Sequence, residues 1–345
     1  MISFARHYSL RHRQTQRGLS LVELMISITI GLLILSVMAT LFSNQSKMRS
    51  ELDKSNRMID NGRYALEVLT DNLRVAGFYG NYMPGGTPAA TPDPCDLAAI
   101  TNAATSPDVL RHHVQGYDAA LATSQIAALP TACGFTYTAG SATTLKSGSD
   151  ILVLRRAGTG TPVVAAAAAA ATVYLQVSNC STDPVSYQLA LGSAALTAFH
   201  DKDCATTASL RPFMVQTYFV SSDNKVGDGI PTLKRTELDP ATGAFVVTPL
   251  VEGIEYMQVD YGLDANADGA ADSYVGTCAN ATCWSNIVSV KINIIARNIE
   301  TASGYTDTKT YVLGSAGNFG PFNDAYKRHA YTQVVRLVNP SGRRE

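Results

Sequence analysis

The sequence predicts an α+β protein in which one long N-terminal α-helix packs on an antiparallel β-sheet head. Two observations support this fold class. Residues 19–43 form an apolar run, and residues 44–80 continue it with apolar side chains at helical spacing. The remaining chain contains short runs rich in β-branched and aromatic residues, separated by turn-forming segments. The helix is therefore expected to have a transmembrane half and an amphipathic half.

The charge balance of the 345-residue chain excludes one class of function. It has 27 Lys and Arg residues against 28 Asp and Glu residues, a formal net charge of −1. A protein that binds nucleic acid through arginine needs an excess of basic residues over phosphates. Only 16% of the residues are charged, whereas about 25% is typical of soluble domains. Small polar residues make up the difference, which is typical of an exported protein.

The N-terminal residues predict how the chain meets a membrane. Residues 1–18 contain four arginines and no acid, and residues 19–42 contain one ionisable side chain, Glu23. A helix of that length spans about 36 Å, which exceeds the roughly 30 Å of a bilayer's hydrocarbon core. The arginines before the apolar run predict a cytoplasmic N-terminus, with everything after residue 43 outside.

A cleaved secretory signal is the competing interpretation of this segment. Such a signal needs an apolar run of about 7 to 15 residues followed by a small-residue cleavage site. Here the run is longer and ends at residues 42–45, FSNQ, without such a site. Glu23 is also unusual, because a carboxylate at the centre of a transmembrane helix costs about 2.5 to 3.5 kcal/mol. It either has a functional partner or reaches the headgroups without a role.

The sequence GLSLVE at residues 18–23 resembles the type IV prepilin cleavage motif. In that motif a glycine precedes the scissile bond and a glutamate is fifth in the mature chain. Leu19 departs from the phenylalanine that most members carry. The resemblance implies that residues 1–18 are a cytoplasmic leader, cut after Gly18 by a prepilin peptidase, and that the new amine of Leu19 is N-methylated. It also implies that Glu23 pairs with the N-terminal amine of a neighbouring subunit and sets axial register.

The predicted amphipathic half carries one apolar stripe. Leu52, Ile59, Leu66 and Leu73 recur every seven residues, and Met48 with Leu69 supplies a second row. We expect the stripe to pack on the sheet of the same chain, and a coiled coil with another pilin is the alternative. Gly77, Gly80 and Pro84 are expected to end the helix.

The segments NGRYALE at residues 61–67 and LRVAGFYG at residues 73–80 resemble the helix end of PilW-type minor pilins. Further similarity lies at residues 227–235, which are hairpin-like, at residues 251–255 and in an expected terminal strand at 332–339. The resemblance implies a type IV pilin-like fold and a non-catalytic role in pilus assembly, within a priming or tip complex that serves surface motility and adhesion. A pseudopilin of a type II secretion system and a tip adhesin module are the alternatives.

The same resemblance implies partners and a location. The partners are the prepilin peptidase, other minor pilins, the major pilin, the inner-membrane assembly platform and membrane lipid before assembly. The protein is expected to span the inner membrane once, with its head in the periplasm, and then to enter the pilus fibre or tip at the cell surface.

Residues 81–345 are expected to form this β-rich head, with a loop-rich insertion at about 85–145. Strands are predicted at 151–155, 213–220, 257–261 and 287–296. The alternation of residues 288–294 indicates a strand with one face in water. The seven alanines at 165–171 are compatible with a short helix and with a loose connection.

Six cysteines support an exported head. They all follow the apolar run, where a bacterial periplasm would oxidise them. The sequence does not select among the many connectivities, and pairing of sequence neighbours is the simplest expectation: Cys95 with Cys133, Cys180 with Cys204, and Cys278 with Cys283. A zinc site is the alternative for the last two, although no second Cys or His pair has metal spacing.

One segment predicts a cofactor, calcium. Residues 264–272, DANADGAAD, match the pattern D-x-[DN]-x-[DN]-G of calcium loops. The predicted ligands are the side chains of Asp264, Asn266, Asp268 and Asp272 and the carbonyl of Ala270. Val275 stands where such loops carry a bidentate glutamate, so a weak site is expected. A plain hairpin turn is the alternative, because Asp, Asn and Gly also favour turns.

Catalytic motifs are absent from the sequence. It contains no G-x-S-x-G, H-E-x-x-H or P-loop pattern, and the histidines at 112, 113, 200 and 329 follow no metal or nucleophile pattern. We therefore expect a protein that is not an enzyme and has no evident nucleic-acid partner.

Overall fold

The computed structural model describes residues 18, 20–141, 143–192 and 199–344. Residues 1–17 of the predicted leader at 1–18 and the predicted mature N-terminus at Leu19 lie outside these residues. The chain forms two compact units, and the boundary between Asp53 and Lys54 falls within the first helix. The second unit therefore includes the C-terminal part of that helix, which the sequence analysis had placed before the head.

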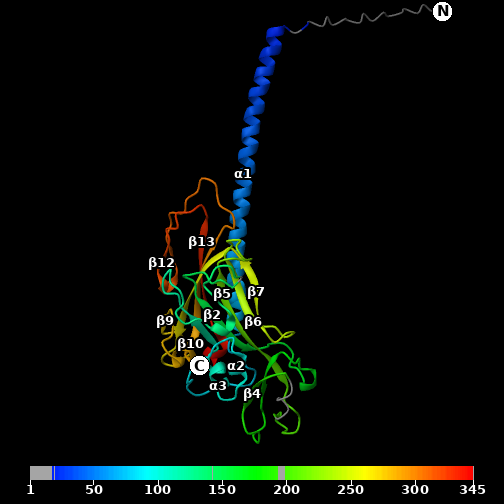
Figure 1. Ribbon diagram of the computed structural model, residues 1–345, viewed down its shortest axis with the longest axis vertical. Helices are drawn as coiled ribbons and strands as arrows, with labels where there is room; N and C mark the ends of the chain where they lie inside the picture. The colour runs from blue at the N-terminus through cyan, green and yellow to red at the C-terminus, as the bar shows by residue number, and fades with distance from the viewer. Residues whose placement is uncertain (1–17, 19, 142, 193–198, 345) are drawn as a thin grey trace, which may run out of the picture. The chain divides into compact units, whose positions relative to one another are not determined.

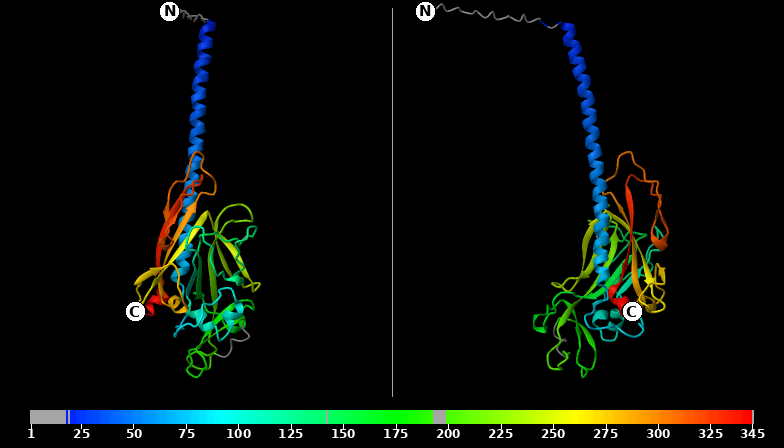
Figure 2. Two further views of the ribbon diagram at one scale, coloured as in Figure 1. Left: turned by 60° about the vertical axis from the view of Figure 1, so that its left-hand side comes forward. Right: turned by 180° about the vertical axis from the view of Figure 1, so that it is seen from behind.

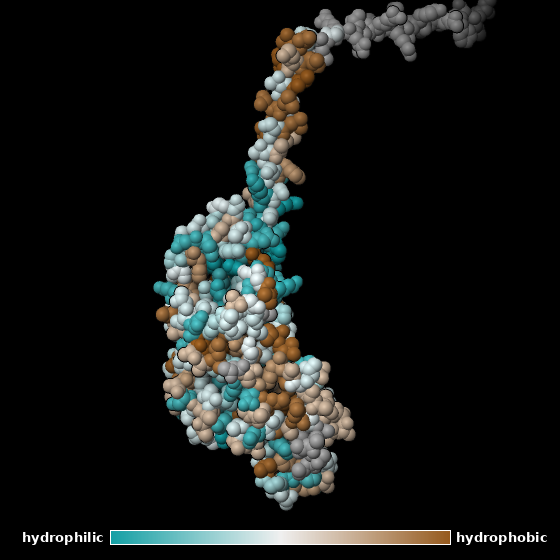
Figure 3. Space-filling view, viewed as in Figure 1, coloured by the Kyte–Doolittle hydropathy of each residue, from teal (hydrophilic) through white to brown (hydrophobic). Residues whose placement is uncertain are grey.

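Helix α1 (Leu21–Arg74) is the longest element. Its apolar side chains from Leu21 to Phe42 are exposed to solvent, and Figure 3 shows them as a brown stretch followed by hydrophilic residues. The helix is long and apolar enough to cross a membrane. This length and composition agree with the predicted transmembrane half.

The helix ends at Arg74, six residues before the predicted limit. Gly77 has a φ of +71°, in the left-handed region that favours glycine. Its N–H donates to the carbonyl of Arg155 at 2.9 Å. A Cβ on Gly77 would lie 3.1 Å from side-chain atoms of His113 and Pro340. Residues 75–80 therefore form a turn against the head, because Gly77 leaves the helical conformation there.

Two antiparallel sheets form the core of the second unit (Figure 1). In the described residues the larger sheet has the order β1–β2–β5–β3–β4, with β6 beside β5 and β7 beside β6. Its strands are β1 (Val114–Tyr117), β2 (Ile151–Ala157), β3 (Val173–Val177), β4 (Tyr187–Leu191), β5 (Leu210–Ser221), β6 (Thr232–Leu238) and β7 (Phe245–Glu252). The smaller sheet has the order β13–β10–β8–β9. Its strands are β8 (Ile254–Leu263), β9 (Ser273–Val275), β10 (Ile287–Arg297) and β13 (Arg328–Arg336), and β11 (Tyr311–Val312) pairs separately with β12 (Asn318–Phe319).

The C-terminal part of α1 lies between the two sheets (Figure 2). Its buried apolar residues are Met58, Ala65, Leu69 and Leu73, which join side chains of β2, β5, β8 and β10 in one core. The prediction that the stripe packs on the sheet of the same chain is confirmed for these residues.

The predicted stripe extends too far toward the N-terminus. Met48 and Leu52 are 66% and 56% exposed, while Ile59 and Leu66 are partly buried beside the core. An α-helix has 3.6 residues per turn, so a seven-residue repeat drifts around its surface by about 20° per heptad. Spacings of three and four residues between Met58 and Leu73 follow the buried face more closely than the repeat of seven does.

Close packing explains the glycine within the NGRYALE segment. A Cβ on Gly62 would overlap the ring of Tyr331 on β13. The hydroxyl of Tyr331 donates to the carbonyl of Ile59 at 3.4 Å. Gly62 therefore lets the helix lie directly against an aromatic side chain of the smaller sheet.

All four predicted strands are present, within β2, β5, β8 and β10. The prediction that β10 has one face in water is wrong, because both faces are almost fully buried. The polar face of β10 is covered instead of solvated. Lys291 pairs with Asp260 on β8 at 3.1 Å, and Asn293 donates to the same carboxylate at 3.2 Å. Ser315 in the β11–β12 hairpin donates two further hydrogen bonds to Asp260.

The terminal strand also differs from the prediction. Strand β13 begins at Arg328 and ends at Arg336, earlier than the predicted 332–339. Leu337 then serves as the N-cap of helix α5 (Val338–Gly342), so the last part of the predicted strand is helical. The carbonyl of Leu337 accepts from the N–H of Ser341, which closes the first turn.

The predicted insertion at 85–145 is only partly loop. It contains α2 (Leu97–Thr101), α3 (Ser106–Arg111), the 3₁₀ turn η1 (Thr131–Cys133) and β1, which extends the larger sheet beside β2. These elements cover the outer face of that sheet with a second apolar core. In the alanine run, Ala165–Ala167 form the 3₁₀ turn η2. The remaining short elements are α4 (Ala281–Ser285) and η3 (Gly314–Ala316).

The cysteines form three disulfides between sequence neighbours. The bonds are Cys95–Cys133, Cys180–Cys204 and Cys278–Cys283. No free cysteine remains in the described residues. This is the simplest pairing anticipated above, and it uses both cysteines of the alternative zinc site.

A buried ion-pair cluster holds the β11–β12 hairpin against the smaller sheet. The side chain of Arg328 is 1% exposed and donates to both carboxylate oxygens of Glu255. Its Nη1 lies 3.0 Å from Asp307 and 2.6 Å from Asp324. The guanidinium carbon of Arg328 lies over the ring face of Phe322, 3.9 Å from the ring centroid. One arginine thus joins β8, β13 and the loop between β10 and β13.

Candidate functional site

The predicted cleavage and assembly residues lie at the start of α1. Gly18 is exposed, with no atom within 4 Å of the position that a Cβ would take. Glu23 lies in the first turn, and its Oε2 accepts from the backbone N–H of Ser20 at 3.1 Å. The carbonyl of Ser20 accepts from the N–H of Leu24 at 3.1 Å. Glu23 therefore satisfies a backbone donor at the helix start, as the glutamate of a capping box does.

Sequence reasoning missed this local role of Glu23. The signal was present, because Ser20 precedes Glu23 by three residues, the spacing of a capping box. The hydroxyls that follow in the apolar run are also satisfied locally. Ser27, Thr29 and Thr40 each donate to the carbonyl four residues earlier. Among the described residues of this run, the Glu23 carboxylate is thus the ionisable group available to a partner.

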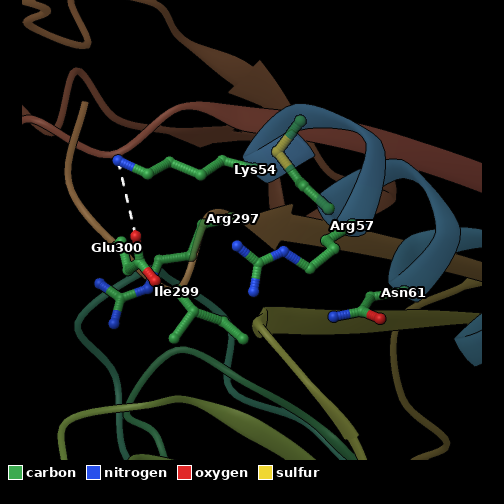
Figure 4. A pocket seen from close by; sticks show the side chains of 7 residues that line it. Lys54, Arg57, Asn61, Arg297, Ile299 and Glu300 are labelled. Carbon is green, nitrogen blue, oxygen red and sulfur yellow. Dashed lines mark ion pairs between the residues drawn. The ribbon is translucent and has the colours of Figure 1, made fainter. Parts of the chain in front are cut away.

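A polar row on α1 contacts the loops of the second unit (Figure 4). Lys54, Arg57 and Asn61 follow one another at helical spacing and project from one side of the helix. Lys54 lies 3.6 Å from Glu300 and donates to the carbonyl of Thr301 at 3.1 Å. Asn61 donates to the carbonyl at the end of β7. These contacts hold this part of α1 at the edge of the head, where its apolar residues from Met58 onward begin to enter the core.

The predicted calcium loop forms a tight turn after β8. Asp264 is buried, and its carboxylate accepts from the backbone N–H groups of Ala267, Asp268 and Gly269 at 2.7 to 3.2 Å. Arg344 pairs with the same carboxylate at 3.2 Å. These hydrogen bonds hold the pKa of Asp264 below its usual value despite the desolvation of the carboxyl.

The other predicted calcium ligands also make hydrogen bonds within the loop. Asp268 accepts from the N–H of Ala270 and from the amide of Asn266, and Asp272 accepts from the N–H of Ala265. In the described residues, no group of three or more His, Cys, Asp or Glu side chains is arranged to hold a metal ion. The side-chain oxygens thus serve the turn in this arrangement, and calcium binding stays a prediction.

Two histidines of the head, His112 and His113, are buried and serve packing. Burial lowers the pKa of His112 to about 4 and that of His113 to about 3. His113 donates from Nε2 to the carbonyl of Ile287, and His112 contacts the carbonyl of Asp108. Both rings are therefore neutral near pH 7, and each is held by a backbone oxygen.

Two family models match the parts of the chain described above. Residues 13–39 match the prokaryotic N-terminal methylation motif, and residues 217–339 match PilW, type IV pilus-assembly protein W. Over these two segments the chain is similar to PilW pilus-assembly proteins and to proteins that carry the methylation motif. The first match includes Gly18 and Glu23, and the second runs from β5 to the end of β13. The second match therefore covers the whole smaller sheet, strands β6 and β7 and the end of β5.

The comparison with solved structures includes a type IV-like pilin from Thermus thermophilus. It shares 11% identity with this chain, with a TM-score of 0.27, over 56% of this chain and 78% of that chain. No curated protein sequence matches the chain. The methylation motif implies processing by a prepilin peptidase and assembly with other pilins, and its apolar helix fits a pilin of the inner membrane.

Proposed function

We propose that this chain is a PilW-type minor pilin that acts in a priming or tip complex of a type IV pilus and so serves surface motility and adhesion. One observation carries the proposal: an exposed Gly18 precedes an apolar helix whose ionisable residue is Glu23, within a chain that matches PilW. Before assembly the helix spans the inner membrane, with the leader in the cytoplasm and the disulfide-bonded head in the periplasm. The major pilin, other minor pilins and the assembly platform are the proposed partners.

The proposed role of Glu23 is to pair with the N-terminal amine of a neighbouring subunit. Within the pilus the helices leave the lipid and bundle together, and a carboxylate buried there needs a cationic partner. The exposed position of Glu23 near the start of α1 supports this role. Its hydrogen bond with Ser20 means that any test must separate charge from helix capping.

The test compares cells in which Glu23→Gln is the only change with cells in which Glu23→Ala is the only change. Glutamine keeps an oxygen that accepts from Ser20 but carries no charge, whereas alanine removes both. We expect both variants to insert in the membrane and to be cleaved after Gly18. We expect neither variant to be present in pili sheared from the cell surface. If Glu23→Gln enters pili as the unchanged protein does, the charge-pairing role is refuted.

Gene deletion separates this function from the alternatives. Deletion is expected to reduce surface pili and twitching while secretion of exoproteins continues. Loss of secretion with normal pili would instead select a type II pseudopilin. Normal pili and twitching with loss of attachment would select a tip adhesin.

A further inference from the structure

A cavity of about 400 Å³ opens at the C-terminal end of the described chain. Four segments line it: the loop at residues 83–87, the end of α3, helix α4 with the residue after it, and helix α5 with the two residues that follow. This volume lies in the range of pockets that hold small molecules, about 300 to 1,000 Å³. The cavity is separate from the N-terminal segment and from the polar row on α1.

The lining of the cavity is cationic. It includes Arg111, Arg343 and Arg344, and none of its lining residues is Asp or Glu. His113 also lines it but is neutral, since burial lowers its pKa to about 3. An anion that entered the cavity would therefore meet three guanidinium groups and no carboxylate on the walls.

Two of these arginines are already positioned by the fold. Arg111 donates from Nε to the carbonyl of Gly85 and pairs with Asp108 at 3.2 Å. Arg344 pairs with Asp264 and donates to the backbone of α4. Both guanidinium groups are thus held by groups behind the cavity wall, which is the preorganisation that a binding site needs.

Arg343 has no such carboxylate. Its Nη1 donates to the carbonyl of Gly77 at 3.4 Å, and no acidic group among the described residues lies within the 4.0 Å of an ion pair. Burial together with the charge of Arg344 lowers the pKa of Arg343. A half-buried guanidinium without a counter-ion is costly, and a bound anion would offset that cost.

The loop at residues 83–87 is shaped around one of these arginines. Gly86 has a φ of +81°, and a Cβ there would lie 2.9 Å from Nη2 of Arg111. The remaining walls carry hydroxyl and amide groups from Thr87, Thr282, Ser285 and Asn286, beside apolar side chains that include Met83 and Pro340. Hydroxyl and amide groups beside guanidinium groups are suited to a hydroxyl-rich anion.

We infer that this cavity binds an acidic sugar, with the carboxylate or phosphate on Arg343 and Arg111 and the sugar hydroxyls on the polar wall. This activity goes beyond the proposed role in pilus assembly, because it assigns the head a ligand at a distance in sequence from the assembly helix. Arginine suits both anions, since its planar fork donates two parallel hydrogen bonds to either.

The test is calorimetry on the full chain in detergent, with galacturonate, glucose 6-phosphate, galactose and inorganic phosphate as probes. Arg343→Gln removes the unpaired charge at the cost of one long hydrogen bond, so this variant is expected to fold. Arg74→Gln is the matched control, because Arg74 is exposed and does not line the cavity. Circular dichroism verifies the fold of each variant.

We expect at least one acidic sugar to bind, galactose not to bind, and Arg343→Gln to weaken binding about tenfold or more, as loss of a hydrogen bond to a charged group does. Arg74→Gln should bind as the unchanged chain does. The carboxylate and phosphate probes distinguish the two sources of charge. The inference is overturned if neither acidic sugar binds, if galactose or inorganic phosphate binds equally well, or if Arg343→Gln leaves affinity unchanged.

Discussion

Replacing Arg328 by methionine should destabilise the head more than loss of any surface ion pair. Methionine fills similar space but leaves Asp307 without its guanidinium partner, and it leaves Glu255 with only the longer contact to Arg297, at 3.5 Å. The side chains of these two acids are 4% and 0% exposed. Removing one partner of a buried ion pair costs about 3 to 5 kcal/mol, because the remaining charge stays desolvated.

This cost converts into a measurable change in melting temperature. Unfolding entropy is about 2.1 cal/mol/K per residue, or about 0.6 kcal/mol/K for a unit of roughly 290 residues. A loss of about 3 to 5 kcal/mol therefore lowers the Tm by about 5 to 8 °C. The assay is thermal unfolding of the full chain in detergent at pH 7.5, followed by circular dichroism.

The control and the pH dependence sharpen the test. Arg74→Met removes a pair with Asp71 in which both side chains are 64% exposed, so we expect a change of about 0 to 1 kcal/mol. The hydrogen bond from Arg328 lowers the pKa of Asp324 in the folded chain. The pair therefore stabilises the unchanged chain above the pKa that Asp324 has when unfolded. This contribution is lost as pH falls through the pKa of Asp324 in the folded chain.

Arg328→Met lacks this contribution at every pH, so the Tm difference from the unchanged chain should narrow as pH falls below 3.8, the usual pKa of this carboxyl. Adding Glu255→Gln should recover part of the loss at pH 7.5. A Tm within about 2 °C of the unchanged chain at pH 7.5, or a difference that does not vary with pH, would refute the reasoning.

Three further outcomes are expected. In urea unfolding, Leu69→Ala should lower the free energy of unfolding by about 2 to 5 kcal/mol, because Leu69 is buried. Leu52→Ala should lower it by less than about 0.5 kcal/mol, because Leu52 is exposed. Equal losses would contradict the assigned core face. Replacing both Cys95 and Cys133 by serine should cost about 3 to 4 kcal/mol because the bond closes a loop of 38 residues, and an unchanged unfolding midpoint would count against this. Calorimetry with millimolar calcium should give heat that Asp268→Ala abolishes, and absence of heat in the unchanged chain would remove calcium from the loop.

Local patterns explain what the sequence could predict. The apolar run sufficed to predict the first part of helix α1, because a helix that can cross a membrane is recognised by its length and hydrophobicity. The strands at 151–155 and 213–220 are central and buried on both faces, so their runs of β-branched and aromatic residues stand out. The GLSLVE segment likewise contains the cleavage motif within six consecutive residues, so the motif can be recognised from the sequence alone.

Features set by distant segments could not be predicted. The alternation in β10 indicated a wet face, and nothing near Asn293 in the sequence indicates that Asp260 and Ser315 cover it. Arg328 meets Glu255 from 73 residues away. The segments that line the cavity are spread from residue 83 to residue 344, so no local sequence pattern connects its arginines.

The order of the disulfides has a consequence for export. Each cysteine bonds with the next one along the chain, at separations of 38, 24 and 5 residues, and no bond encloses another. A chain that crosses the membrane from its anchored N-terminus presents Cys95 first, then Cys133, and so on in turn. An oxidase that joins successive thiols as they emerge therefore makes the native set directly. Under the proposed export, the head would therefore reach its correct covalent form without a shuffling step, even while its last strands were still being translocated.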